Sequence, residues 1–124
     1  MFPLEKFQQI DTPFYYYDTE LLRQTLSAIR DNITPEMHVH YAVKACANPK
    51  VLSIIAQEGF GADCVSGGEV QAAIDAVDAD YVIGLGHLGD DPASQPWTSE
   101  EVLENVTGFD AFIDGHSHTT MAEK

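Results

Sequence analysis

Short apolar segments that alternate with helix-capping residues constrain this chain more than any other feature of its sequence. Strand-like runs rich in aromatic and β-branched residues are expected at 14–17, 39–45, 62–65, 81–83 and 111–114. Helix-capping residues follow four of these runs at Asp18, Asn48, Ser66 and Thr98. Strands that alternate with helices pair in parallel through right-handed crossovers. The sequence therefore predicts an α/β fold with a mostly parallel five-stranded sheet and alternating helices, either a partial (β/α) barrel or an open sheet.

The helices are expected to bury one apolar face each. The first runs over about 19–31, and the second begins at Pro49 and ends before Gly59. The third extends to about Val77 and the fourth over about 99–106. The residues expected to be buried are Leu22, Leu26, Ile29, Val51, Leu52, Ile54, Ile55, Val70, Ala73, Ile74 and Val77.

The charge and cysteine content exclude several classes of function. The 124 residues carry a net charge of −14, which argues against nucleic-acid binding because acidic surfaces repel phosphate backbones. No run approaches the roughly 18–20 apolar residues of a membrane span, and from the N-terminal residues we expect no secretory signal. Two cysteines make no disulfide framework, so a reducing, cytoplasmic location is expected.

The charge is divided unevenly between two segments. Residues 1–77 have a net charge of −5, and residues 78–124 have a net charge of −9. Such a change indicates a boundary between segments of different origin. A solvated acidic face is the alternative explanation.

Lys44 is the basic residue at the end of the apolar run 39–45. A lysine removed from water has a lowered pKa, so its neutral amine is a better nucleophile. The carboxyl ends of parallel strands are also where α/β folds bind ligands. Lys44 is therefore a candidate for covalent catalysis, and the alternative is a strand-end lysine whose amine extends into solvent.

Three motifs around Lys44 occur in the order and spacing of a known enzyme family. They are Phe14–Asp18 (FYYYD), His40–Pro49 (HYAVKACANP) and Gly61–Glu69 (GADCVSGGE). With these motifs, residues 3–76 resemble the N-terminal part of diaminopimelate decarboxylase, a pyridoxal-phosphate (PLP) enzyme with an alanine-racemase-like barrel. The resemblance implies amino-acid decarboxylation in lysine biosynthesis, with PLP as cofactor and a small-molecule substrate.

The resemblance also implies roles for particular residues. Lys44 would be the catalytic lysine that binds PLP covalently, Ala42 would approach the cofactor, and Asp63 would lie near both. A strand-end cap is the alternative role for Asp63. Cys46 departs from the family, because many relatives carry asparagine at this position. A barrel of this kind needs about 250 residues, so we expect the 124 residues to supply its first three strand–helix units and an incomplete site.

Three histidines form a different pattern in the second segment. His87 follows the fourth expected strand, and His116 and His118 follow the fifth. Neutral imidazoles at neighbouring strand ends suit zinc, manganese or iron, and exposed loop histidines are the alternative. The runs around them make residues 78–119 resemble the 5'-nucleotidase branch of the calcineurin-like metallophosphatases. This resemblance implies a divalent-metal site, with zinc or manganese bound by His87, His116 and His118.

The two resemblances meet between residues 69 and 80, where the charge distribution also changes. We therefore interpret the sequence as a chimera of natural, engineered or artefactual origin. Three functions stay open: a PLP-dependent decarboxylase fragment, a metal-binding phosphatase-like segment, and a folded chimera without catalytic activity. Unpaired sheet edges predict self-association into a homo-oligomer.

Overall fold

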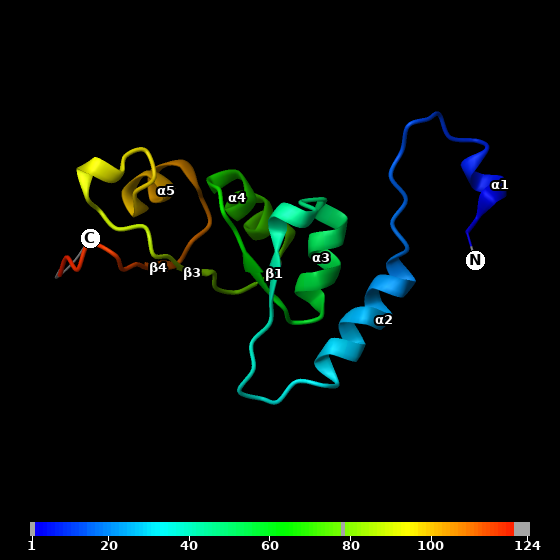
Figure 1. Ribbon diagram of the computed structural model, residues 1–124, viewed down its shortest axis with the longest axis horizontal. Helices are drawn as coiled ribbons and strands as arrows, with labels where there is room; N and C mark the ends of the chain where they lie inside the picture. The colour runs from blue at the N-terminus through cyan, green and yellow to red at the C-terminus, as the bar shows by residue number, and fades with distance from the viewer. Residues whose placement is uncertain (1, 78, 121–124) are drawn as a thin grey trace.

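The computed structural model describes residues 2–77 and 79–120 of an elongated α/β molecule (Figure 1). Helix α1 (Leu4–Phe7) lies at one end, on an arm that leads into helix α2 (Thr19–Arg30). Helices α3 (Pro49–Gln57) and α4 (Gly67–Ala76) lie at the centre, beside strands β1 (His40–Ala42) and β2 (Gly61–Asp63). The remaining elements form the other end: β3 (Ile83–Leu85), a 3-10 turn (Pro92–Ser94), α5 (Ser99–Asn105) and β4 (Ala111–Ile113).

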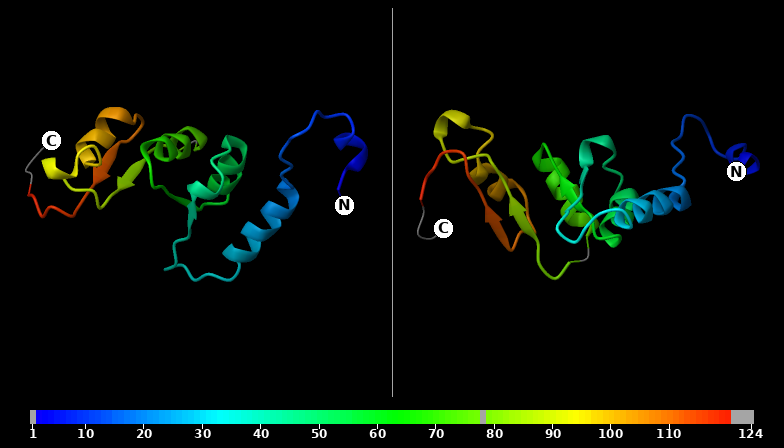
Figure 2. Two further views of the ribbon diagram at one scale, coloured as in Figure 1. Left: turned by 45° about the horizontal axis from the view of Figure 1, so that its top comes forward. Right: turned by 60° about the horizontal axis from the view of Figure 1, so that its bottom comes forward.

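The described strands form two separate two-stranded parallel sheets. In the first, His40 pairs with Gly61 and Ala42 with Asp63. The second sheet joins β3 to β4, and both views in Figure 2 show it apart from the first. The expectation of mixed α/β structure with parallel strands is confirmed, whereas the single five-stranded sheet is not formed.

The segment 14–17 is the expected strand that is missing. Its backbone joins no sheet, and its aromatic rings pack instead against the arm's short helix. The Phe7 ring lies 5.3 Å from that of Phe14 and 5.0 Å from that of Tyr16, measured between ring centroids. Aromatic content alone therefore favoured a strand here, but the segment has no strand partner, and the rings of Phe14 and Tyr16 pack on Phe7 instead.

The helix starts agree with the expected caps. The side chains of Asp18 and Asn48 accept hydrogen bonds from the backbone N–H groups of Leu21 and Lys50, each at 3.0 Å. Ser66 caps α4 by accepting from Glu69. Thr98 forms the complete capping box of α5: its side chain accepts from the Glu101 backbone N–H, and the Glu101 carboxylate accepts from the Thr98 backbone N–H. Each cap satisfies N–H groups that the first helical turn leaves without partners.

The apolar core lies between α2 and α3. A cluster of four buried side chains forms it: Leu26, Val51, Ile54 and Ile55. Leu22, Tyr41, Cys46 and Phe60 pack around this cluster and are partly buried. The predicted core positions of α3 are all buried, whereas Ile29 in α2 remains 37% exposed. No helix within the described residues is long and apolar enough to cross a membrane.

Candidate functional site

Lys44 lies just beyond β1, in a 3-10 turn formed by Val43–Ala45. The strand ends at Ala42, so Lys44 is not part of the longer strand that the sequence predicts. Val43 is fully buried and anchors the turn in the protein interior, while the Lys44 side chain is exposed. The expectation of a lysine desolvated within an apolar strand is therefore wrong, because the strand ends before Lys44 and the turn buries Val43 while it leaves Lys44 and Ala45 exposed.

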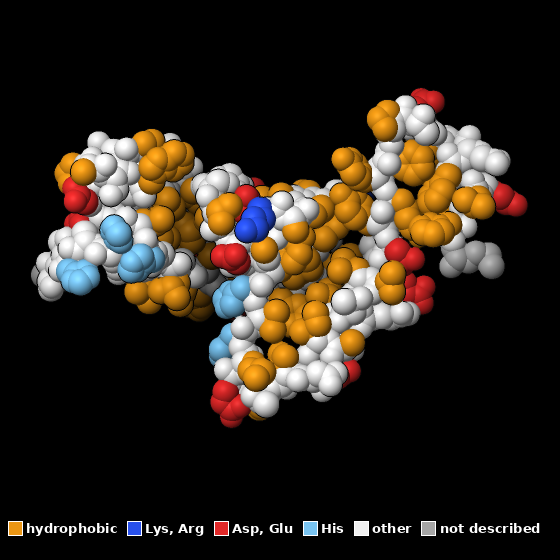
Figure 3. All heavy atoms as spheres, in the orientation of Figure 1, with side chains coloured by type: hydrophobic (Ala, Val, Ile, Leu, Met, Phe, Trp, Pro, Cys, Tyr) orange, Lys and Arg blue, Asp and Glu red, His pale blue; other side chains and the backbone are white. Residues whose placement is uncertain are grey.

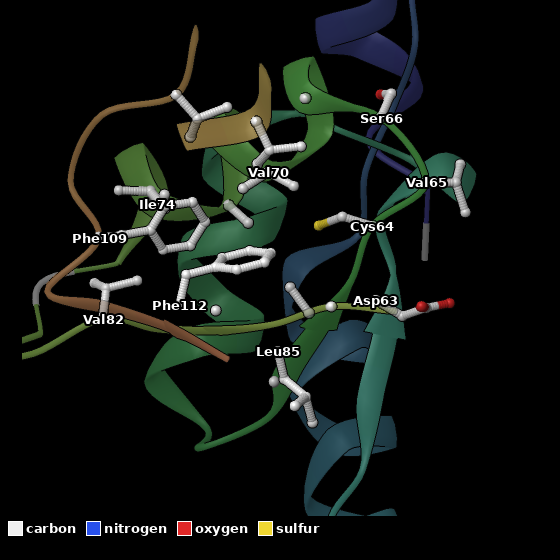
Figure 4. A pocket seen from close by; sticks show the side chains of 18 of the residues that line it. Asp63, Cys64, Val65, Ser66, Val70, Ile74, Val82, Leu85, Phe109 and Phe112 are labelled. Atoms are coloured by element: carbon white, nitrogen blue, oxygen red, sulfur yellow. The ribbon is translucent and has the colours of Figure 1, made fainter. Parts of the chain in front are cut away.

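Ala42 and Asp63 lie opposite each other at the carboxyl ends of β1 and β2. Ala42 is half-buried and Asp63 is exposed. Figure 4 shows the Asp63 carboxylate pointing away from the apolar side chains beside it. Among the described residues, Asp63 forms no ion pair with Lys44. The sheet thus brings the three predicted residues to one edge without a direct contact between the lysine and the carboxylate.

Cys46 follows the lysine turn and makes contacts that sequence reasoning did not anticipate. Its Sγ donates a hydrogen bond to the Tyr17 hydroxyl at 3.4 Å. The Tyr41 hydroxyl donates to the Cys46 carbonyl, also at 3.4 Å. Tyr17 belongs to the FYYYD motif and Tyr41 to β1. Both tyrosines therefore lie beside Cys46. The bond with Tyr17 joins two separate motifs, and no spacing within either motif indicates it.

A groove of about 1090 Å³ lies between the two sheets and is lined mainly by apolar side chains. Figure 4 shows Ile74, Phe109 and Phe112 against one another on one side of it, with Cys64 pointing inward from β2's end. The Phe109 and Phe112 ring centroids are 5.4 Å apart. Lys44 is not among the residues that line this groove. The lysine amine and the groove are therefore separate features.

Cys64 in this groove is a poor candidate for a nucleophile. Burial raises the pKa of its thiol above the ordinary value, and the negative charges of Glu69 and Asp63 raise the pKa further. The thiol therefore stays protonated near neutral pH, whereas nucleophilic cysteines react as thiolates.

Two of the three predicted metal-binding histidines lie together. The His87 and His116 ring centroids are 5.1 Å apart, and all three histidines, including His118, are exposed. Figure 3 shows histidine side chains gathered at the end of the molecule that holds the β3–β4 sheet. The described residues contain no group of three His, Cys, Asp or Glu side chains placed to bind a metal. The structure thus gives no support to the predicted metal site.

Asp114 organises the loop that carries His87. Its carboxylate accepts hydrogen bonds from the backbone N–H groups of Leu88 and Gly89, at 2.8 and 2.7 Å. Burial alone would raise the Asp114 pKa, but these bonds, with others from Gly115 and Ser99, lower it below the ordinary value. The role of Asp114 in this segment is therefore to hold two loops together.

Comparison with known proteins gives one consistent family. The family described as "Pyridoxal-dependent decarboxylase, pyridoxal binding domain" matches residues 19–88, more than half of the chain. The diaminopimelate decarboxylase of Bacteroides thetaiotaomicron is 62% identical over 78 residues, which cover 61% of this chain and 20% of the relative. That of Helicobacter pylori is 38% identical over 86 residues, covering 68% and 21%. The chain thus spans about a fifth of the length of these curated relatives.

A solved structure agrees with these relatives. The crystal structure of the Helicobacter pylori diaminopimelate decarboxylase complexed with L-lysine superposes with a TM-score of 0.61 and 32% sequence identity. The superposition covers 87% of this chain and 27% of that chain. The arrangement of parallel strands and helices in this chain therefore matches a fragment of a decarboxylase barrel.

The comparisons give no support to a nucleotidase segment or to a chimera. The family match continues to residue 88, past the expected junction between residues 69 and 80. A diaminopimelate decarboxylase from Synechocystis is 36% identical over 103 residues, more than the first segment contains. Similarity to decarboxylases thus extends into residues 78–124. The histidine motifs there are short runs, which are weaker evidence than a match that continues along the chain.

Proposed function

The chain belongs to the pyridoxal-dependent decarboxylase family, and from this premise we propose that it supplies the lysine-bearing part of a PLP site, with Lys44 as the residue that binds the cofactor. The family match and the resemblance of the chain to the N-terminal part of diaminopimelate decarboxylase support this proposal. The proposed chemical class is decarboxylation of an amino acid, and the relatives' name suggests a diamino acid as substrate.

The observation that carries the proposal is the position of Lys44 directly after β1, at the carboxyl end of a parallel strand. This edge is where α/β folds place their ligand-binding groups. The exposed amine suits a cofactor that reacts through an aldehyde, since such a cofactor must reach the nitrogen directly. Asp63 adds a carboxylate at the end of the paired strand, so the donor set fits a cofactor with a cationic ring.

Lys44, Asp63 and Ala42 would each have a separate role in the proposed reaction. When bound, PLP supplies a ring that accepts the electron pair left behind as a carboxyl group departs as carbon dioxide. Lys44 Nζ would hold the cofactor, and its amine would also hold a proton that it could deliver to the substrate. Asp63 would balance positive charge of the cofactor at the same edge, and the small side chain of Ala42 would let the cofactor approach.

The cysteines agree with a reducing compartment, which we propose to be the cytoplasm. Cys46 and Cys64 are both free thiols in the structure. Free thiols persist where glutathione and thioredoxin keep them reduced.

Titration of the purified chain with PLP tests the proposal. We expect a new absorbance band of a lysine-bound cofactor, and borohydride reduction should fix the cofactor to Lys44 in a peptide that mass spectrometry identifies. Lys44→Ala should abolish both signals. Lys50→Ala is the matched control, because Lys50 is also exposed, and its capping bond to Asn48 uses only the backbone N–H.

Two outcomes would contradict the proposal. One is the absence of any lysine-bound band in the unmodified chain. The other is an equal loss of signal in Lys44→Ala and Lys50→Ala, which would indicate nonspecific modification of exposed amines. A rise in melting temperature with added PLP, seen in the Lys50→Ala control but not in Lys44→Ala, provides an independent measure of binding to the folded state.

A further inference from the structure

The turn that carries Lys44 is fastened at its far end by two tyrosines that meet at Cys46. The thiol of Cys46 donates to the Tyr17 hydroxyl, and the Tyr41 hydroxyl donates to the Cys46 carbonyl, each at 3.4 Å. The Cys46 backbone N–H also donates to the Val43 carbonyl at 3.0 Å and closes the turn around the lysine. Three hydrogen bonds at one residue thus restrain the backbone that follows Lys44.

The two tyrosines approach Cys46 from different parts of the molecule. Tyr41 belongs to β1 and packs, together with Cys46, against the apolar core cluster. Tyr17 belongs to the extended segment that precedes Asp18, the cap of α2. Its hydroxyl therefore connects the start of α2 to the lysine turn. Without this bond, the Cys46 side chain would keep only its packing against the core.

We infer that Tyr17 is a positioning residue for Lys44, which holds the lysine turn through the thiol of Cys46 and so fixes the direction of the Lys44 amine. The inference rests on the proposed function, because the direction of the amine matters only if it binds a cofactor. Precise placement of a reacting group accounts for a large part of enzymatic rate and affinity, and small displacements weaken both.

The environment of Tyr17 agrees with this role. Its pKa is raised, mainly by the side-chain hydrogen bond with Cys46 and in addition by burial. The contact with Cys46 thus favours the protonated hydroxyl, which can both donate and accept a hydrogen bond. Tyr15 is the natural comparison, since it is 90% exposed and its ring stacks on that of Tyr17 at 6.5 Å between centroids. No hydrogen bond of the Tyr15 hydroxyl occurs within the described residues.

The first test measures the thiol and needs no cofactor. The rate at which iodoacetamide alkylates Cys46 should differ between Tyr17→Phe and the unmodified chain, because the substitution removes the hydrogen-bond partner of the thiol and leaves the ring. We expect a change of about two- to tenfold, the range that corresponds to one ordinary hydrogen bond. Tyr15→Phe should leave the rate unchanged, and the Cys64 rate in the same sample serves as an internal reference.

The second test measures the lysine. The dissociation constant for PLP, followed by absorbance and by borohydride labelling at Lys44, should rise about two- to tenfold in Tyr17→Phe. Cys46→Ala should have the same effect, whereas Cys46→Ser keeps an O–H donor and should retain most of the affinity. The double variant Tyr17→Phe/Cys46→Ala should bind no more weakly than either single variant, since both remove one shared interaction.

The outcomes separate this inference from the proposed function. If the unmodified chain is not labelled at Lys44, the proposed function is wrong and the inference falls with it. If labelling occurs but Tyr17→Phe binds PLP as tightly as Tyr15→Phe, only the inference is overturned. Melting temperatures establish whether each variant folds, and if Tyr17→Phe does not, equal affinities of Cys46→Ser and Cys46→Ala would equally refute a role for the thiol.

Discussion

Residues 2–77 and residues 79–120 each contain one two-stranded parallel sheet, but they are held together in different ways. In the first region, apolar side chains of α2 and α3 form a cluster in which Ile55 is 4% and Leu26 is 6% exposed. In the second region, the buried residues include Thr98 and Ser99, which are 2% and 7% exposed. Ser99 bonds to the Gly89 carbonyl through both its backbone and its side chain. The first region therefore depends on apolar packing and the second on polar contacts.

The exposure of the second sheet explains why polar contacts matter there. Ile83, Leu85 and Ile113 are 65%, 82% and 58% exposed, so one face of the β3–β4 sheet contributes little burial. Hydrogen bonds such as those that Leu88 and Gly89 donate to Asp114 therefore contribute a larger share of the stability in the second region than hydrogen bonds do in the first. A hydrogen bond depends on particular donor and acceptor positions, whereas apolar burial tolerates many arrangements.

Removing a core side chain should have the largest effect, and it should act through the first region. Ile55→Ala leaves a cavity at a fully enclosed position of α3, for which we expect a loss of about 2–5 kcal/mol in the free energy of unfolding. Urea denaturation followed by circular dichroism measures this loss, because α2 and α3 contain much of the helix.

The control for this prediction is Ile29→Ala in α2. Ile29 is 37% exposed and should lose much less stability for the same change in chemistry. A loss at Ile29 equal to that at Ile55 would contradict the view that a packed cluster stabilises the first region.

The same contrast explains what the sequence could and could not predict. Apolar spacing indicated the buried side chains of α3, and capping residues indicated its start at Pro49 and the start of α5 at Ser99. These are local signals, which a single sequence records directly. The exposure of Lys44 could not be predicted, because β1 ends at Ala42, three residues before the apolar run 39–45 ends, and a turn follows. The same holds for the 14–17 segment, whose partners depend on tertiary structure.

The sequence predicted residues for the candidate site but did not predict their contacts. The motifs indicated Lys44, Ala42 and Asp63, and the sheet register brings the last two together. The bond between Tyr17 and Cys46 joins residues 29 positions apart and has no local signature. The histidine pattern, in contrast, led to a metal site that the described residues do not form.

Acid should weaken the second region first through Asp114. Its pKa is lowered in the folded chain, whereas an unfolded aspartate titrates near a pKa of about 3.9. The carboxylate therefore stabilises the fold above that unfolded value, and this contribution is lost as the pH falls through the lower, folded value. Fluorescence of Trp97, the single tryptophan, measures the change in the loop that Asp114 restrains.

Asp114→Asn isolates this carboxylate from the others that titrate in acid. The amide keeps one acceptor oxygen and loses the charge, so we expect about 1–3 kcal/mol less stability at neutral pH. The Trp97 signal of the variant should also depend less on pH below the unfolded aspartate pKa of about 3.9. An unchanged acid transition would mean that other carboxylates control the second region.

The smallest effect should come from the contact between the two regions, and it tests whether they unfold as one unit. The Gln71 side chain in α4 accepts from the Thr107 N–H at 3.0 Å and donates to the Thr107 carbonyl at 3.4 Å. Gln71→Ala should cost about 0.5–1.5 kcal/mol, and it should lower the urea midpoint of Trp97 fluorescence more than that of circular dichroism. Gln57→Ala is the matched control, since Gln57 accepts from Arg23 at 3.2 Å entirely within the first region. Equal shifts of both probes in Gln71→Ala would show that α4 couples the regions into one cooperative structure, and that their different interactions do not make them independent.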